Sequence, residues 1–140
     1  MAQLDPLDVS TCQLSDALAK LGHYALGLAG IWPLEPAKSF VGIARTVQFQ
    51  HKDEAGPGAR IEYLDYVQPG DVIVIDNAGR IDASSFGGQR ALKAKQRNAA
   101  GVVLNGAYRD VTELQGIDLP IYGVGRTVAS SKQGGIPVAV

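Results

Sequence analysis

The feature that most constrains the fold is an uninterrupted apolar run, Val72–Ile75, flanked by Asp71 and Asp76. A run of branched apolar residues without polar alternation is typical of a strand that is buried on both faces. Strands of this kind occur in sheets that are covered by helices, so the run predicts an α/β fold. Residues 101–104 predict a second buried strand, and residues 119–124 predict a third.

The segments around these runs predict helices and one further strand. Leu14, Ala17, Leu18 and Leu21 follow the spacing of an amphipathic helix, which we expect over residues 8–21. Further helices are predicted from Gly87 through Asn98 and over 111–115, and a strand is predicted over 40–50. Tight turns are expected at residues 77–80 and 105–106. Strands that alternate with helices indicate a sheet with at least partly parallel pairing.

The length and composition of the chain narrow the kinds of protein that it can be. The chain has 140 residues, 46% of them hydrophobic and 19% charged, which predicts one folded domain over residues 1–140. It contains no apolar run of the roughly 18 residues that a membrane helix needs. The N-terminus lacks the basic and apolar regions of a signal peptide, and Cys12 is the single cysteine, so we expect a cytoplasmic protein. A net charge of −1 gives no electrostatic reason to expect a nucleic-acid partner.

Common catalytic signatures are missing from the sequence. His23 and His51 are isolated, and no His or Cys cluster has the spacing of a metal site. The sequence contains neither a Gly-Lys-Ser phosphate loop nor a Gly-x-Ser-x-Gly nucleophile elbow. Gly123 and Gly125 begin like a dinucleotide fingerprint, but Val128 stands where the third glycine would fall. These absences leave residues 86–110 as the segment of interest.

Two parts of this segment can carry chemistry. Gly87 and Gly88 lie where a loop is predicted to enter a helix, so the N–H groups of Gln89 and Arg90 can face a small anion. Arg109 and Asp110 follow the predicted strand at 101–104, at the edge where open α/β sheets usually hold ligands.

The Arg109–Asp110 pair has two interpretations. The Asp110 carboxylate can bind a hard divalent cation that keeps most of its waters, and the Arg109 guanidinium can hold an oxyanion or a substrate carboxylate. The alternative is an ion pair that only fixes a turn. From the residues alone both remain open.

Several segments in order resemble the RraA-like family, which comprises 4-hydroxy-4-methyl-2-oxoglutarate aldolases and regulators of ribonuclease E activity. The resemblance covers almost the whole chain, through residues 10–18, 42–47, 69–76, 101–110 and 119–122. It implies an α/β fold of the RraA-like swivelling β/β/α type, similar to phosphohistidine domains. Most members carry several dozen further residues, so we expect this chain to lack the family's C-terminal part.

The resemblance also implies roles for the segment of interest. The aldolase pattern is an Asp, twenty intervening residues and then Arg-Asp, and its second half matches Arg109-Asp110. By resemblance, Asp110 would hold Mg²⁺ or Mn²⁺ and Arg109 would stabilise the keto or enolate oxygen. Gly87, Gly88, Gln89 and Arg90 match the substrate-binding cradle for the pyruvyl carboxylate. Position 88, however, holds a glycine where the aldolases have the acid that positions a proton-carrying water.

The function implied by the resemblance is a metal-dependent lyase that acts on small 2-oxo acids and releases pyruvate. The reaction would be retro-aldol cleavage of a 4-hydroxy-4-methyl-2-oxoglutarate-type substrate, or decarboxylation of oxaloacetate, with catalysis weakened by Gly88. The alternatives are a non-catalytic binding protein of the ribonuclease-regulator type and an inactive remnant. Family members form trimers or hexamers, so we expect a homo-oligomer, such as a homotrimer. No glycine-rich loop follows the first strand to support binding of S-adenosylmethionine.

Overall fold

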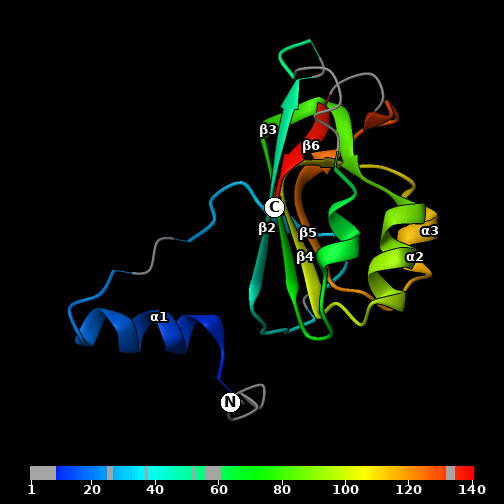
Figure 1. The fold of residues 1–140 in the computed structure, drawn as a ribbon. Helices are drawn as coiled ribbons and strands as arrows, with labels where there is room; N and C mark the ends of the chain where they lie inside the picture. Colours follow the sequence, from blue (N-terminus) through cyan, green and yellow to red (C-terminus); the bar gives the residue numbers. More distant parts are fainter. Residues whose placement is uncertain (1–8, 25–26, 37, 52, 56–60, 132–134) are drawn as a thin grey trace.

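The computed structural model describes residues 9–24, 27–36, 38–51, 53–55, 61–131 and 135–140. In chain order the elements are α1 (Thr11–Lys20), β1 (Trp32–Pro33), β2 (Ala44–His51), the 3₁₀ helix η1 (Tyr63–Tyr66), β3 (Val72–Phe86), α2 (Gly88–Gln96), β4 (Gly101–Tyr108), α3 (Val111–Gln115), β5 (Ile121–Arg126) and β6 (Gly135–Ala139). The strands form one six-stranded sheet in the order β1-β5-β4-β3-β2-β6. The four inner strands are parallel to one another, and β1 and β6 pair antiparallel at the two edges. The prediction of a mixed α/β fold with partly parallel pairing is confirmed (Figure 1).

The hydrophobic core lies between one face of the sheet and the helices α2 and α3 (Figure 1). Ile73 and Ile75 on β3 and Val102 and Leu104 on β4 are almost fully buried. The inward face of α2 is formed by two alanines, Ala91 and Ala94, whose side chains have no exposed surface. Small side chains let the helix lie close to the sheet, which fixes the position of its N-terminus relative to the ends of β3 and β4.

Strand β3 is far longer than the apolar run that predicted it. The turn expected at residues 77–80 is wrong, because the strand continues through them and bends instead of reversing. Ala78 and Gly79 have φ values of 53° and 69°, and the register with β4 shifts between Asp76 and Arg80. The bend brings the last residues of β3, which end at Phe86, beside the N-terminus of α2.

The tight turn expected at Asn105 and Gly106 is also wrong, since both residues lie inside β4. The Asn105 side chain donates to Asp76 Oδ1 at 2.8 Å on the neighbouring strand. A Cβ on Gly106 would lie 3.0 Å from Asn77 Cβ, so the glycine permits a close approach at the bend of β3. Contacts between strands have therefore overridden a local turn signal.

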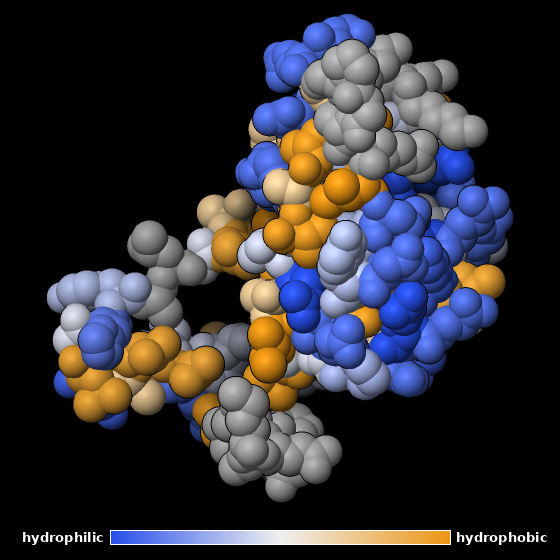
Figure 2. Space-filling model, viewed as in Figure 1, coloured by the Kyte–Doolittle hydropathy of each residue, from blue (hydrophilic) through white to orange (hydrophobic). Residues whose placement is uncertain are grey.

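Helix α1 forms where its pattern predicts it, but it lies apart from the sheet (Figure 1). A capping box closes its start: Ser10 Oγ accepts from the N–H of Gln13 at 3.2 Å, and Gln13 Oε1 accepts from the N–H of Ser10 at 2.9 Å. None of its residues is buried, and Leu14 is 51% exposed. Figure 2 shows apolar side chains on the visible surface of this helix. None of the helices in the described part of the chain is long and apolar enough to span a membrane.

Candidate functional site

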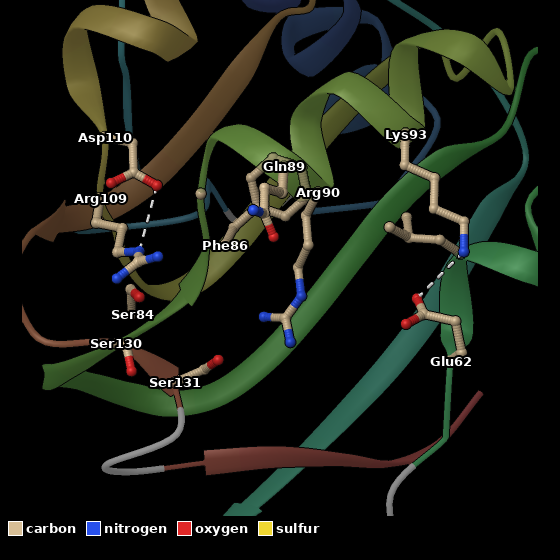
Figure 3. Close-up of a pocket in the computed structure, with 12 residues that line it drawn as sticks. Glu62, Ser84, Phe86, Gln89, Arg90, Lys93, Arg109, Asp110, Ser130 and Ser131 are labelled. Carbon is tan, nitrogen blue, oxygen red and sulfur yellow. Dashed lines mark ion pairs between the residues drawn. The ribbon is translucent and has the colours of Figure 1, made fainter.

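A pocket opens beside the N-terminus of α2, next to the ends of β3 and β4 (Figure 3). Its volume is about 270 Å³, and its walls are mostly polar or charged. The lining residues are Glu62, Leu64, Ser84, Phe86, Gly87, Gln89, Arg90, Lys93, Arg109, Asp110, Ser130 and Ser131. The structure thus places five of the six predicted site residues in one pocket, and the sixth, Gly88, is buried at the start of α2.

Two hydrogen bonds join the halves of the predicted site. The N–H of Arg109 donates to the carbonyl of Phe86 at 3.1 Å, which ties the end of β4 to the end of β3. The N–H of Gly88 donates to Asp110 Oδ2 at 3.1 Å, so this carboxylate satisfies one free N–H of the first turn of α2. The N–H groups of Gln89 and Arg90 belong to the same turn, where the helix itself supplies no acceptor. Gln89 and Arg90 both line the pocket, so the predicted anion cradle would lie at its wall.

Asp110 has an unusual backbone conformation for a residue that is not glycine. Its φ and ψ of 58° and 43° lie in the left-handed region, which costs about 1 kcal/mol for an L-residue. The conformation places the side chain next to Arg109, whose Nε lies 3.2 Å from Asp110 Oδ2. The ion pair considered from the sequence is therefore formed, and it is formed at a pocket. A conformation held against its preference at a pocket supports a role in ligand binding.

Gly87 is required by a close approach. A Cβ at this position would lie 2.7 Å from Asp110 Oδ2 and 3.1 Å from Arg109 Cγ. Its φ of −166° is extended and open to any residue, so contact rather than backbone conformation explains the glycine. Any larger residue would push the Arg109–Asp110 pair out of place.

A side chain at position 88 would meet a different residue from one at position 87. A Cβ there would collide with the carboxylate of Glu113 on α3, which fills the space where a side chain at position 88 would begin. Glu113 is exposed and does not line the pocket. An acid introduced at position 88 would therefore have to displace the end of a flexible side chain that carries the same charge.

The side chain of Arg90 extends into the pocket (Figure 3). Its guanidinium carbon lies 5.6 Å from the centre of the Phe49 ring and 5.8 Å from that of Tyr63, within the range of cation–π attraction. Its Nη1 donates to the carbonyl of Ser85 at 2.6 Å. Tyr63 is 1% exposed, and burial raises the pKa of its hydroxyl, so the phenol stays neutral. The rings thus form a neutral platform that holds the guanidinium in place.

Sequence reasoning missed the other polar residues of the pocket. Lys93 lies one turn after Gln89 on α2, so helical spacing alone could have added it to the site. Its Nζ lies 3.1 Å from Asp65 Oδ1 and 3.8 Å from Glu62 Oε1. Ser130 and Ser131 lie far along the chain from the predicted motif, and no sequence signal connected them with it.

The donor set around Asp110 limits how a divalent cation could be held. In the part of the chain that the structure describes, no three His, Cys, Asp or Glu side chains are placed to share a metal ion. Asp110 is the carboxylate beside Arg109, and its Oδ2 already accepts from the N–H of Gly88 and forms the ion pair with Arg109. Oδ1 would then be the protein oxygen offered to a cation whose other ligands are water and substrate, an arrangement that Mg²⁺ tolerates well.

Comparison with known proteins identifies the relatives of this chain. The model of a family described as Aldolase/RraA matches residues 11–140. This chain belongs to the RraA-like family. A relative from Halalkalibacterium halodurans, named "Putative 4-hydroxy-4-methyl-2-oxoglutarate aldolase", is 37% identical over 127 residues, which are 91% of this chain and 57% of the relative. Protein DlpA of Legionella pneumophila is 32% identical over 128 residues, which are 90% of this chain and 21% of that protein.

Solved structures of RraA-like proteins share the fold. Streptomyces coelicolor RraAS2, described as an unusual member of the RNase ES inhibitor RraA protein family, aligns with a TM-score of 0.79 at 30% identity. The alignment covers 94% of this chain and 66% of that one. An uncharacterized protein from Pseudomonas syringae aligns with a TM-score of 0.81 at 34% identity, over 94% of this chain and 61% of that one. The chain therefore spans less than two thirds of the length of these relatives.

Proposed function

We propose that this RraA-like protein is a divalent-metal-dependent lyase that cleaves small 2-oxo acids and releases pyruvate. The observation that carries the proposal is the convergence of Arg109, Asp110 and the first turn of α2 on one polar pocket. Relatives named as aldolases support the same class of reaction. The substrates would be 4-hydroxy-4-methyl-2-oxoglutarate, oxaloacetate or close analogues.

Binding would use groups that are already arranged around the pocket. The N–H groups of Gln89 and Arg90 would receive the carboxylate next to the 2-oxo group, assisted by the dipole of α2. Asp110 would hold Mg²⁺ or Mn²⁺ through one oxygen. When bound, such a cation supplies Lewis-acid polarisation of the 2-oxo group.

Arg109 would stabilise the charge that develops during C–C cleavage. Its Nε is engaged by Asp110, which leaves its terminal amino groups to donate toward substrate. An arginine fixed in this way is preorganised for an enolate oxygen, so little reorganisation is needed when charge appears. Gly88 supplies no carboxylate for proton transfer, so the proton would come from bulk water or another group. General acid–base assistance is worth about 10² to 10⁴ in rate, and we therefore propose weakened catalysis.

The experiment that tests the proposed lyase measures the release of pyruvate. Purified protein is incubated with oxaloacetate, and separately with 4-hydroxy-4-methyl-2-oxoglutarate, in Mg²⁺ and then with excess EDTA. We expect pyruvate release above the uncatalysed rate in Mg²⁺ and a return to background in EDTA. A rate equal to that of Mg²⁺ without protein would reject the lyase.

Gly88 also favours a second function. A binding protein that acts by protein contact needs no acid at this position, and solved neighbours include the RNA-processing inhibitor RraA of Thermus thermophilus, with a TM-score of 0.71 at 26% identity. Absence of metal-dependent pyruvate release, together with an intact fold, would favour this regulatory function over the lyase.

A further inference from the structure

Arg90 stands out among the charged groups of the pocket because its guanidinium has no carboxylate partner within the described part of the chain. Four other arginines, Arg45, Arg80, Arg97 and Arg109, each form an ion pair with an aspartate. Arg90 instead donates to a backbone carbonyl and lies over two aromatic rings. A half-buried guanidinium without a carboxylate partner can bind an anionic ligand without first breaking an ion pair.

The guanidinium of Arg90, unlike its backbone N–H, lies apart from the groups that would bind the 2-oxo end of a substrate (Figure 3). Figure 3 shows its guanidinium between the Arg109–Asp110 pair on one side and the Lys93–Glu62 pair on the other. Lys93 is already balanced by Asp65 and Glu62, so Arg90 carries the uncompensated positive charge of this wall. The pocket, at about 270 Å³, is larger than a three-carbon acid requires.

We infer that the Arg90 side chain binds the distal carboxylate of a dicarboxylic 2-oxo acid and so makes the pocket select diacids over monoacids. The inference rests on the proposed function, in which the first turn of α2 and Arg109 bind the other end of the substrate. The guanidinium presents a planar fork of donors that matches a carboxylate, and one bond to Ser85 leaves the remaining donors for it. Because the rings of Phe49 and Tyr63 hold it in place, little side-chain freedom is lost on binding.

The test measures binding of two unreactive acids that differ only at the distal end. 2-Oxoglutarate and 2-oxopentanoate have the same carbon chain, and only the first carries a second carboxylate. Calorimetric titration in Mg²⁺ compares the wild type with Arg90→Gln, Arg90→Lys and Lys95→Gln. Lys95 is the matched control because it removes the same charge from the same helix but contacts Asp118 outside the pocket. Thermal melting of each variant shows that it is folded.

We expect the wild type and Lys95→Gln to bind the diacid at least about 10-fold more tightly than the monoacid. In Arg90→Gln the ratio should fall to near one, and Arg90→Lys should retain part of it, since it keeps the charge but loses the fork. Equal affinity for both acids in the wild type, or an unchanged ratio in folded Arg90→Gln, would overturn the assignment. Absence of binding by either acid would also overturn it, and pyruvate release from oxaloacetate by the same preparation would then show that the proposed lyase stands without it. Arg90-dependent diacid binding without any pyruvate release would support Arg90 while rejecting the lyase.

Discussion

Asp76 and Asp110 both follow apolar strand segments, yet the structure gives them opposite environments. Asp76 lies on β3 and accepts from three donors: Ala78 N–H at 2.9 Å, Asn105 Nδ2 at 2.8 Å and Gln48 Nε2 at 3.3 Å. Both of its oxygens are engaged in bonds that tie β2, β3 and β4 together. Asp110 accepts through Oδ2, has a left-handed backbone and lines a pocket. The bonds of Asp76 give it a structural role in joining the strands, whereas the left-handed backbone of Asp110 at a pocket supports the proposed role in ligand binding.

The largest effect should come from removing the charge of Asp110. Asn is almost the same size and tolerates the left-handed region, so Asp110→Asn should fold normally. We expect its pyruvate release to fall by at least about 10³-fold, because both cation binding and the placement of Arg109 depend on this carboxylate. The matched variant Asp76→Asn should keep its kcat/KM within about twofold. Equal losses in the two variants would remove the distinction between the two aspartates.

A smaller loss should follow from displacing the Arg109–Asp110 pair without changing it. Gly87→Ala would place a methyl group against Asp110 Oδ2 and Arg109 Cγ. Misplacement of catalytic groups by about 1 Å can cost about 10²-fold, so we expect kcat/KM to fall by about 10- to 100-fold. The control is Gly125→Ala, whose added Cβ would lie 3.8 Å from Ile81 Cγ2, an ordinary contact. Wild-type activity in Gly87→Ala would show that the close approach has no part in the site.

Introducing an acid at position 88 should increase the rate of pyruvate release. Gly88→Asp alone would collide with Glu113, so the acid is best restored in the double variant Gly88→Asp/Glu113→Ala. We expect its kcat to exceed that of Glu113→Ala by at least about 10-fold, a fraction of what general acid–base catalysis can supply. The single variant Gly88→Asp should gain less. If the double variant gains nothing, the missing carboxylate is not what limits catalysis.

The smallest effect concerns acid stability at Asp76. The N–H of Ala78 holds the pKa of Asp76 below its usual value against the opposing effect of burial, and the side chains of Asn105 and Gln48 lower it further. A lowered pKa in the folded state contributes stability above the unfolded pKa of about 3.9, and this contribution is lost as pH falls through the folded pKa. The melting temperature of Asp76→Asn should therefore lie a little below that of the wild type at pH 7. The gap should close below about pH 4, and a gap that widens on acidification would contradict this account.

The sequence correctly predicted those helices and strands whose formation depends on the residues next to them. The helix over 111–115, the helix α1 and the strand beginning near Val72 all depend on neighbouring residues, and the structure confirms them. The bend of β3 and the pairing of Asn105 depend on contacts between strands, so turn signals misled at both places. The pattern of α1 predicted its apolar stripe correctly but could not show that none of its residues would be buried.

The sequence predicted the motif residues of the candidate site but not the contacts that residues from distant parts of the chain make there. Motif residues at 87–90 and 109–110 lie together because two strands end at one edge, which a parallel sheet makes foreseeable. The environment of Arg90 was not foreseeable, because Phe49, Tyr63 and Ser85, which contact its guanidinium, come from other elements of the chain. The obstruction of position 88 by Glu113 likewise appears only when α2 and α3 are placed side by side.

The central claim is that Asp110, and not Asp76, holds a divalent cation for a 2-oxo acid. Titration with Mn²⁺, followed by water proton relaxation, tests it without depending on turnover. The account predicts one Mn²⁺ site per chain in the wild type and in Asp76→Asn, with binding tightened by pyruvate and lost in Asp110→Asn. Undiminished Mn²⁺ binding in folded Asp110→Asn, or loss of binding in Asp76→Asn, would contradict it.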